Sequence, residues 1–239
     1  MSRIFKICTT LVLSLVLTGC FHFSEDIWIE SDASGRIKFD LAISEKLVGS
    51  LESMSQYAKD NAENKATELK SPINLETVKQ QLETNSYIRK VKAQEYSDAG
   101  FRHYLVDVRV KDFHELPKIE EIVTSSFDGN NSKVDDKKPL ATFSFTGTNP
   151  KNITFEQNLR INDVADKTKT EPSNKATDAV MGVFFNMLFA EEYNYITLHA
   201  AHIDDANGLI NDEETIVKWS IPFNKLFSPN VLKAEFSYR

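Results

Sequence analysis

The sequence predicts an α+β domain with a mainly antiparallel sheet and about four helices packed on it. Three observations favour this class. Strand-like segments follow one another in hairpin order, helical segments interrupt them without strict alternation, and no internal repeat is present. With 239 residues, 41% of them hydrophobic, the chain is long enough to bury a sizeable core.

The first residues have the layout of a secretory signal peptide. Arg3 and Lys6 precede an uninterrupted apolar and small-residue stretch over 7–17. A membrane-spanning helix needs roughly 20 apolar residues, and this stretch is shorter. A permanent membrane span is therefore not expected here.

The segment Leu17-Thr18-Gly19-Cys20 resembles the bacterial lipobox, whose cysteine receives a diacylglycerol before the chain is cut in front of it. We therefore expect a lipoprotein signal peptide over 1–19 and a lipid on Cys20 that attaches the chain to a membrane. The alternative is an ordinary cleaved signal with an incidental cysteine. The expected location is the outer side of the cytoplasmic membrane, or the periplasmic face of the outer membrane in a host with two membranes.

Cysteine usage and net charge limit the chemistry of the mature chain. Cys8 lies in the expected signal peptide and Cys20 carries the expected lipid, so no thiol remains for a disulfide, thiolate catalysis or zinc. The formal net charge is −7, which disfavours nucleic acid as a partner. We expect no cofactor.

Residues 20–26 are expected to form a short membrane tether, and residues 27–239 a single α+β domain. Alternation and β-branched content predict strands at 27–29, 37–43, 91–93, 104–110, 140–145, 153–161, 195–203, 215–221 and 231–238. In one of them, 153–161, the polar residue Gln157 interrupts the apolar face.

Four helices are expected between these strands. Ser44 and Asn74 are N-cap residues of the first two, and Pro117 lies early in the third. The fourth, Ala176 to Ala190, is apolar on nearly all sides, so it is either buried in the core or lines a cavity for a lipid or other apolar ligand. For the cavity, the candidate ligand-binding residues are the bulky ones at its centre: Val183, Phe184, Met187 and Leu188.

Two patterns resemble metal sites, and both favour a structural interpretation. His199 and His202 stand three apart in an expected strand, which places them on opposite faces. Residues 203–214 align in part with an EF-hand calcium loop, but Ile203 stands where the first oxygen ligand is required. We therefore expect no catalytic or metal-binding residues, and an acidic β-hairpin turn in 203–214.

The segments Glu30 to Arg36, Ala206-Asn207-Gly208 and Ile216 to Pro222, taken with the lipobox, resemble the mycobacterial LppM-like family of lipid-anchored envelope domains. That family commonly has a Pro-Gly pair a few residues before its Asn-Gly, where this sequence has Ala201-His202. The resemblance implies an α/β envelope domain that contacts lipids or amphiphiles, and it carries over no catalytic residues.

These observations favour a non-enzymatic binding or scaffolding domain held at a membrane, with a lipid, an apolar ligand or an envelope protein as its partner. Two alternatives stay open. An envelope hydrolase with catalytic residues scattered in the sequence predicts a pocket with a histidine and a carboxylate in contact. An adaptor for another envelope protein predicts an exposed apolar patch.

Overall fold

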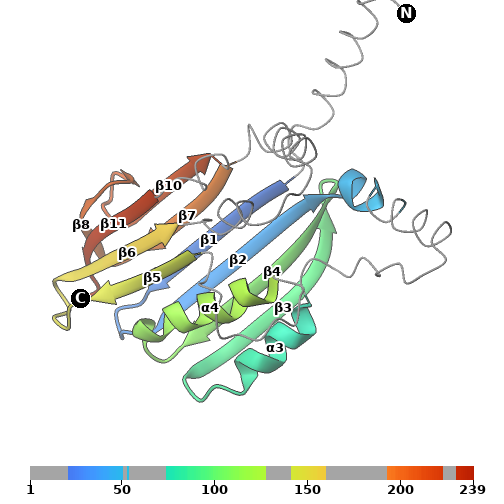
Figure 1. The fold of residues 1–239 in the computed structure, drawn as a ribbon. Coiled ribbons are helices and arrows are strands. Elements are labelled where there is room, and N and C mark those ends of the chain that lie inside the picture. The colour runs from blue at the N-terminus through green and yellow to red at the C-terminus, as the bar shows by residue number, and fades with distance from the viewer. Residues whose placement is uncertain (1–20, 51–52, 54–73, 128–140, 160–192, 223–229) are drawn as a thin grey trace, which may run out of the picture.

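The computed structural model describes residues 21–50, 53, 74–127, 141–159, 193–222 and 230–239, and two β-sheets form most of this part of the chain (Figure 1). The strands are β1 (Phe21–Ile29), β2 (Gly35–Ser44), β3 (Ile88–Asp98), β4 (Phe101–Val110), β5 (Ala141–Thr146), β6 (Ile153–Leu159), β7 (Tyr193–His199), β8 (His202–Ala206), β9 (Leu209–Ile210), β10 (Ile216–Pro222) and β11 (Asn230–Ser237). Sheet A has the order β3-β4-β2-β1-β7-β10-β9, and sheet B the order β5-β6-β11-β8. The α+β class is confirmed.

Sheet A is mixed rather than antiparallel throughout, which corrects part of the expectation. Its neighbouring strands are antiparallel except β1 and β7, which run parallel with Trp28 opposite His199. A parallel pair needs a crossover connection instead of a hairpin. The sequence pattern did not predict this pairing, because the alternation of buried and exposed residues along a strand does not depend on the direction of its neighbour.

The first strand begins at Phe21 and not at Ile27. Residues 21–26, expected to form a tether, pair with β2 along their whole length, from Phe21 opposite Ile43 onward. The polar residues of this segment indicated a loop, but Glu25 is buried in the core and its neighbours point the other way. The described chain therefore enters sheet A directly.

The expected strand 195–203 is two strands. β7 ends at His199 in sheet A and β8 begins at His202 in sheet B, so the chain changes sheets at Ala200 and Ala201. Side chains on either side of this corner are buried in both strands, with Leu198 and Ile203 nearly inaccessible. The apolar pattern of the sequence therefore continues across the corner between the two strands, and it gave no sign that the chain changes sheets there.

Three of the four expected helices are found: a helical segment over 45–50, α3 (Leu75–Glu83) and α4 (Leu116–Phe127), which the 3-10 helix η1 (Phe113–Glu115) precedes. Asn74 caps α3 by accepting a hydrogen bond from the Thr77 N–H at 3.1 Å. Ser44 caps a helical segment over 45–50 in the same way, through the Leu47 N–H at 3.2 Å. The fourth expected helix, 176–190, lies outside the described residues and stays a prediction.

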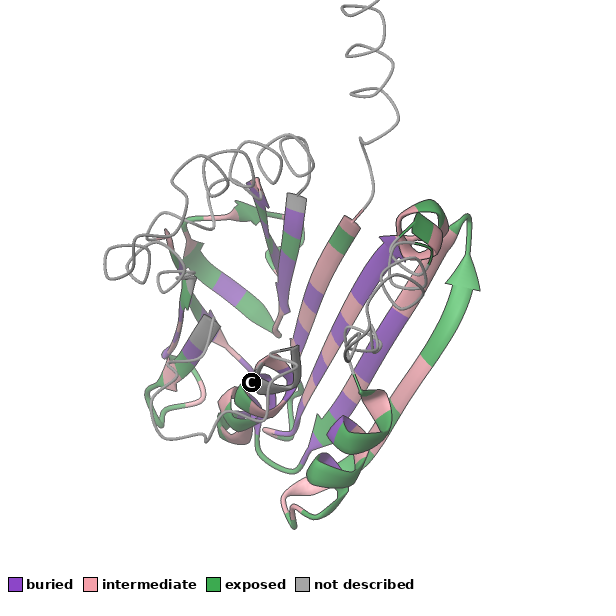
Figure 2. Cartoon of the chain, turned by 45° about the vertical axis from the view of Figure 1, so that its right-hand side comes forward, coloured by how far each residue is buried: buried purple, intermediate pink, exposed green. Residues whose placement is uncertain are grey.

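The core lies between the inner face of sheet A and a second layer made of α3, α4 and sheet B. α3 and α4 lie against the β2-β4-β3 side of sheet A, with sheet B beside them (Figure 1). Figure 2 shows burial alternating along β1, β2 and β4, whose inner side chains are mostly aliphatic. Sheet B adds aromatic rings, among them Phe143, Phe155 and Phe236. Each buried side chain of this kind contributes about 1.5–3 kcal/mol.

Gly35 allows η1 and α4 to approach the first residue of β2. A Cβ atom at this position would lie 2.8 Å from Leu116 Cδ1 and 2.9 Å from Phe113 Cα. Leu116 and Phe113 are fully buried, and the Phe113 N–H donates to the Ala33 carbonyl at 3.0 Å. The turn before β2 is therefore packed tightly against the start of the helix.

We expect Gly35→Ala to lower the free energy of unfolding by about 1–3 kcal/mol, the usual cost of overpacking a filled core. Gly49→Ala is the matched control, because a Cβ atom there meets nothing within 4 Å and alanine favours helix over glycine. Urea unfolding of both variants measures the difference. Equal stability of the two variants would contradict the close packing of η1 on β2.

Candidate functional site

The residues expected to carry the lipid and to bind an apolar ligand lie outside the described residues. They are Cys20 and, in the apolar helix, Val183, Phe184, Met187 and Leu188. Their roles stay predictions. Within the described ranges, no helix combines the length and apolar character that crossing a membrane requires.

Three polar side chains meet in the core where sheet A, sheet B and α4 join. Glu25 on β1, Glu120 on α4 and Gln157 on β6 are exposed by only 2%, 1% and 0%. Gln157 Nε2 donates to Glu25 Oε2 and to Glu120 Oε1, each at 3.0 Å. The second carboxyl oxygen of Glu120 accepts from the Phe143 N–H of β5, also at 3.0 Å. One amide group thus joins two carboxyl groups that come from different layers.

Burial makes negative charge on both carboxyl groups unfavourable. It raises the pKa of Glu120 to about 7, although hydrogen bonds from Gln157 and the Phe143 N–H partly oppose the rise. Burial, and after it the nearby Glu120 and Asp26, raise the pKa of Glu25 well above its ordinary value, against the hydrogen bond from Gln157. The pair therefore keeps protons at pH values where surface carboxyl groups are ionised.

Two oxygen atoms of this cluster accept no hydrogen bond from any described residue, namely Glu25 Oε1 and Gln157 Oε1. An unpaired buried oxygen costs about 1–3 kcal/mol. Protonation of Glu25 turns its free oxygen from an acceptor into a donor and removes the charge at the same time. The cluster is thus chemically a proton-binding site inside the core.

We expect the protein to lose stability as the pH rises from about 4.5 to above 7. The pKa of Glu120 is 4.5 in the unfolded chain and about 7 in the folded protein. The stabilisation that protonated Glu120 gives the fold is therefore complete below pH 4.5 and is lost as the pH rises through 7. For a shift of this size the loss is on the order of 3 kcal/mol. Urea unfolding measured between pH 4.5 and 8 gives the slope of the free energy of unfolding against pH.

Glu25→Gln tests the source of this slope. The variant keeps an oxygen that accepts from Gln157 but removes one ionisable group, so stability should fall less steeply with pH. Glu235→Gln, on the exposed face of β11, is the control and should leave the slope unchanged. An identical slope in both variants would rule out the buried pair as its cause.

The outer face of sheet A carries a row of polar and aromatic side chains on four neighbouring strands. Arg36 on β2 donates two hydrogen bonds of 2.8 Å to Asp107 on β4. Its guanidinium carbon lies 4.5 Å from the centre of the Trp28 ring on β1, and this ring stacks on His199 of β7 at 4.8 Å. Because Arg36 and His199 come from the strands on either side of β1, they cover opposite faces of Trp28.

His103 and Asp40 form the histidine–carboxylate contact that the hydrolase alternative requires. His103 Nδ1 lies 2.9 Å from Asp40 Oδ1, across the β4–β2 pair, and the Tyr96 ring stacks on the imidazole at 4.6 Å. A hydrolase also needs a nucleophile beside the imidazole. In the described part of the chain, the polar and ring contacts of His103 are with Asp40 and Tyr96, and neither a serine nor a cysteine is among them.

The two metal-like sequence patterns do not come together as sites. His199 lies on sheet A and His202 on sheet B. Asn207, inside 203–214, is hydrogen-bonded through its Oδ1 to the Trp219 Nε1–H and to the Lys233 N–H, each at 2.9 Å. Over the described ranges, no three His, Cys, Asp or Glu side chains gather where they could hold a metal ion. The acidic hairpin turn is confirmed between β9 and β10.

Glu25 and Glu120 were not predicted from the sequence. Each stands at or beside a core position: Glu25 is two residues before Ile27 on the inner face of β1, and Glu120 follows Ile119 in α4. The one sign of this cluster in the sequence analysis was Gln157, which interrupts the apolar face of an expected strand. A search for polar residues at expected core positions would have found Gln157, but not Glu25, which lay in the expected tether, or Glu120, which lay beside the apolar face of its helix.

Comparisons with known proteins do not place the chain in a family. No protein-family model matches it, and no curated protein matches it. Among solved structures it is similar to the folded domain of LppM from Mycobacterium tuberculosis, determined by NMR, with a TM-score of 0.48 and 13% identity over 92% of this chain and 90% of that one. A likeness this remote carries no inference about function, so the LppM-like resemblance of the sequence motifs stays a prediction.

Proposed function

We propose that the chain is a membrane-anchored, non-enzymatic binding or scaffolding domain of the bacterial cell envelope. The observation that supports this best is the position of β1, which begins at Phe21, one residue after the lipobox-like cysteine. A lipid on Cys20 is then attached directly to the central strand of sheet A. The position of the whole sheet relative to the membrane follows from that single attachment.

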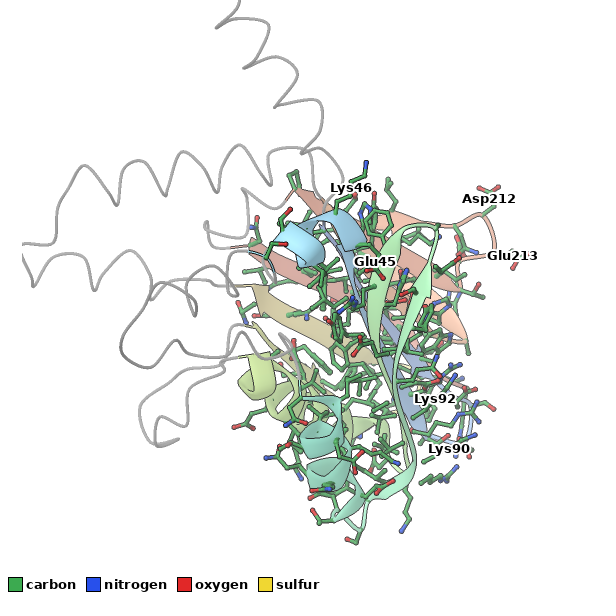
Figure 3. The ribbon with its side chains drawn as sticks, turned by 90° about the vertical axis from the view of Figure 1, so that its right-hand side faces the viewer. Glu45, Lys46, Lys90, Lys92, Asp212 and Glu213 are labelled. Carbon is green, nitrogen blue, oxygen red and sulfur yellow. The ribbon has the colours of Figure 1, made fainter. Side chains whose placement is uncertain are left out.

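The lipid attachment defines which end of sheet A lies at the membrane. β2 ends at Ser44 and β4 begins at Phe101, and these residues are paired at the same end of the sheet as Phe21. Phe21 and Phe23 pack partly against the core there, and Figure 3 shows the exposed Lys46 just beyond Ser44. Aromatic and lysine side chains at this end suit a membrane interface.

We expect Cys20→Ser to remove the mass of the lipid and, because the lipid precedes the cut before residue 20, to leave residues 1–19 on the chain. Two or more acyl chains make attachment lasting, at about 0.8 kcal/mol per buried methylene group. Mass spectrometry measures both changes. Cys8→Ser, inside the expected signal peptide, is the matched control and should leave both unaltered.

The binding role includes an apolar ligand if the segment 176–190 lines a cavity. Titration of the Cys20→Ser chain with a fluorescent fatty acid tests this version, with saturable binding expected. Met187→Asp should then weaken the binding, because a carboxylate in an apolar site is strongly disfavoured. Absence of saturable binding would reject the ligand and favour the scaffolding role.

A further inference from the structure

The outer face of sheet A is far more basic than the chain as a whole. The formal net charge is −7, yet six cations lie on the outer positions of β2, β3, β4 and β10, where strand partners in register share a face. They are Arg36, Lys38, Lys90, Lys92, Arg109 and Lys218. The same face of these strands and of β1 carries four carboxylates: Asp26, Asp40, Asp98 and Asp107. Cations are therefore in excess on this face.

Four of these cations form a cationic patch towards the β3 edge: Lys38, Lys90, Lys92 and Arg109. Lys90 is opposite Arg109, which is opposite Arg36, so three cations stand in one row on neighbouring strands. Strands lie about 4.8 Å apart, and like charges placed opposite one another destabilise a sheet. Asp107 already engages Arg36, whereas Lys90, Lys92 and Arg109 are exposed. An anionic partner would relieve this repulsion.

The matching negative charge lies at the other edge of the same sheet. Asp212 and Glu213 are exposed in the β9–β10 turn, which we name the acidic turn, and Figure 3 shows them far from Lys90 and Lys92. Asn211 Oδ1 fixes this turn by accepting from the Thr215 and Ile216 N–H groups at 2.9 and 2.8 Å. Beside it, Leu209 is 77% exposed. The turn thus presents fixed carboxylates next to an apolar side chain.

We propose that the cationic patch binds the acidic turn of a second copy of this chain. β3 and β9 are the two edge strands of sheet A, about 29 Å apart at the usual strand spacing, so a single copy cannot pair its own patch with its own turn. The two surfaces differ, so each contact leaves one patch and one turn free. Copies therefore add head to tail.

Two other occupants fit the patch less well. Trp28, the aromatic ring in the same row as the patch, cannot stack on a base or sugar, because Arg36 and His199 cover both of its faces. A membrane holding the chain by Cys20 is also distant, because the row of Trp28 lies eight residues along β1, about 26 Å from the attachment. Charge complementarity with a second copy does not depend on the lipid.

Sedimentation velocity on residues 20–239 carrying Cys20→Ser tests the proposal, because a chain without lipid and signal peptide needs no detergent micelle. At low salt the mean sedimentation coefficient should rise with concentration, and salt should reverse the rise by screening. Lys90→Glu with Lys92→Glu, or Asp212→Lys with Glu213→Lys, should each weaken association by about tenfold or more. Lys46→Glu with Lys151→Glu is the control of equal charge change, on exposed residues elsewhere, and should associate normally.

Mixing the two charge-reversed chains separates a specific contact from general repulsion. In each variant alone, the patch and the turn of two copies carry charge of the same sign. In an equimolar mixture, the patch of either variant meets opposite charge on the turn of the other, so the mixture should associate head to tail as the unreversed chain does. A chain carrying all four reversals should associate again. Association unaffected by the reversals, or none in the unreversed chain, would overturn the proposal. So would binding of phosphatidylglycerol vesicles that requires Lys90 and Lys92 in a chain that stays monomeric.

Discussion

Hydrogen bonds connect β1, directly or through one side chain, to both sheets and to α4. This strand pairs with β2 on one side and with β7 on the other, so it joins the two halves of sheet A. On its inner face, Glu25 reaches Gln157 of sheet B and, through that amide, Glu120 of α4. On its outer face, Trp28 lies between Arg36 and His199. Displacement of β1 would therefore disturb both sheets and the helix together.

The carboxyl groups of the protein respond to pH in two opposite ways. Burial would raise the pKa of Asp107, but hydrogen bonds and charge from Arg36 lower it, so this pair stabilises the fold above the ordinary aspartate pKa and loses its effect on acidification. The buried Glu25 and Glu120 have raised pKa values and stabilise the fold at low pH instead. The two kinds of site together favour a mildly acidic optimum of stability.

Local features of the fold could be predicted from the sequence, and contacts between distant segments could not. The helix caps at Ser44 and Asn74 each involve a residue only three positions further along the chain. The alternation of apolar and polar residues in a strand likewise involves residues one or two positions apart. The hydrogen bond from Gln157 to Glu25 joins residues 132 positions apart, and the sequence of neither segment indicates that the two are in contact. The parallel β1–β7 pair and the change of sheets after His199 were missed for the same reason.

The parallel pairing of β1 with β7 also affects how the chain reaches this structure. A ribosome delivers the N-terminal strands first, and pairing between segments far apart in sequence is slow. β2 can pair with one edge of β1 as soon as the turn between them forms, but the other edge stays unpaired until Asn194 to His199 have been synthesised. During that interval the nascent chain exposes an open edge at what becomes the centre of its sheet, where shielding by a chaperone would matter most.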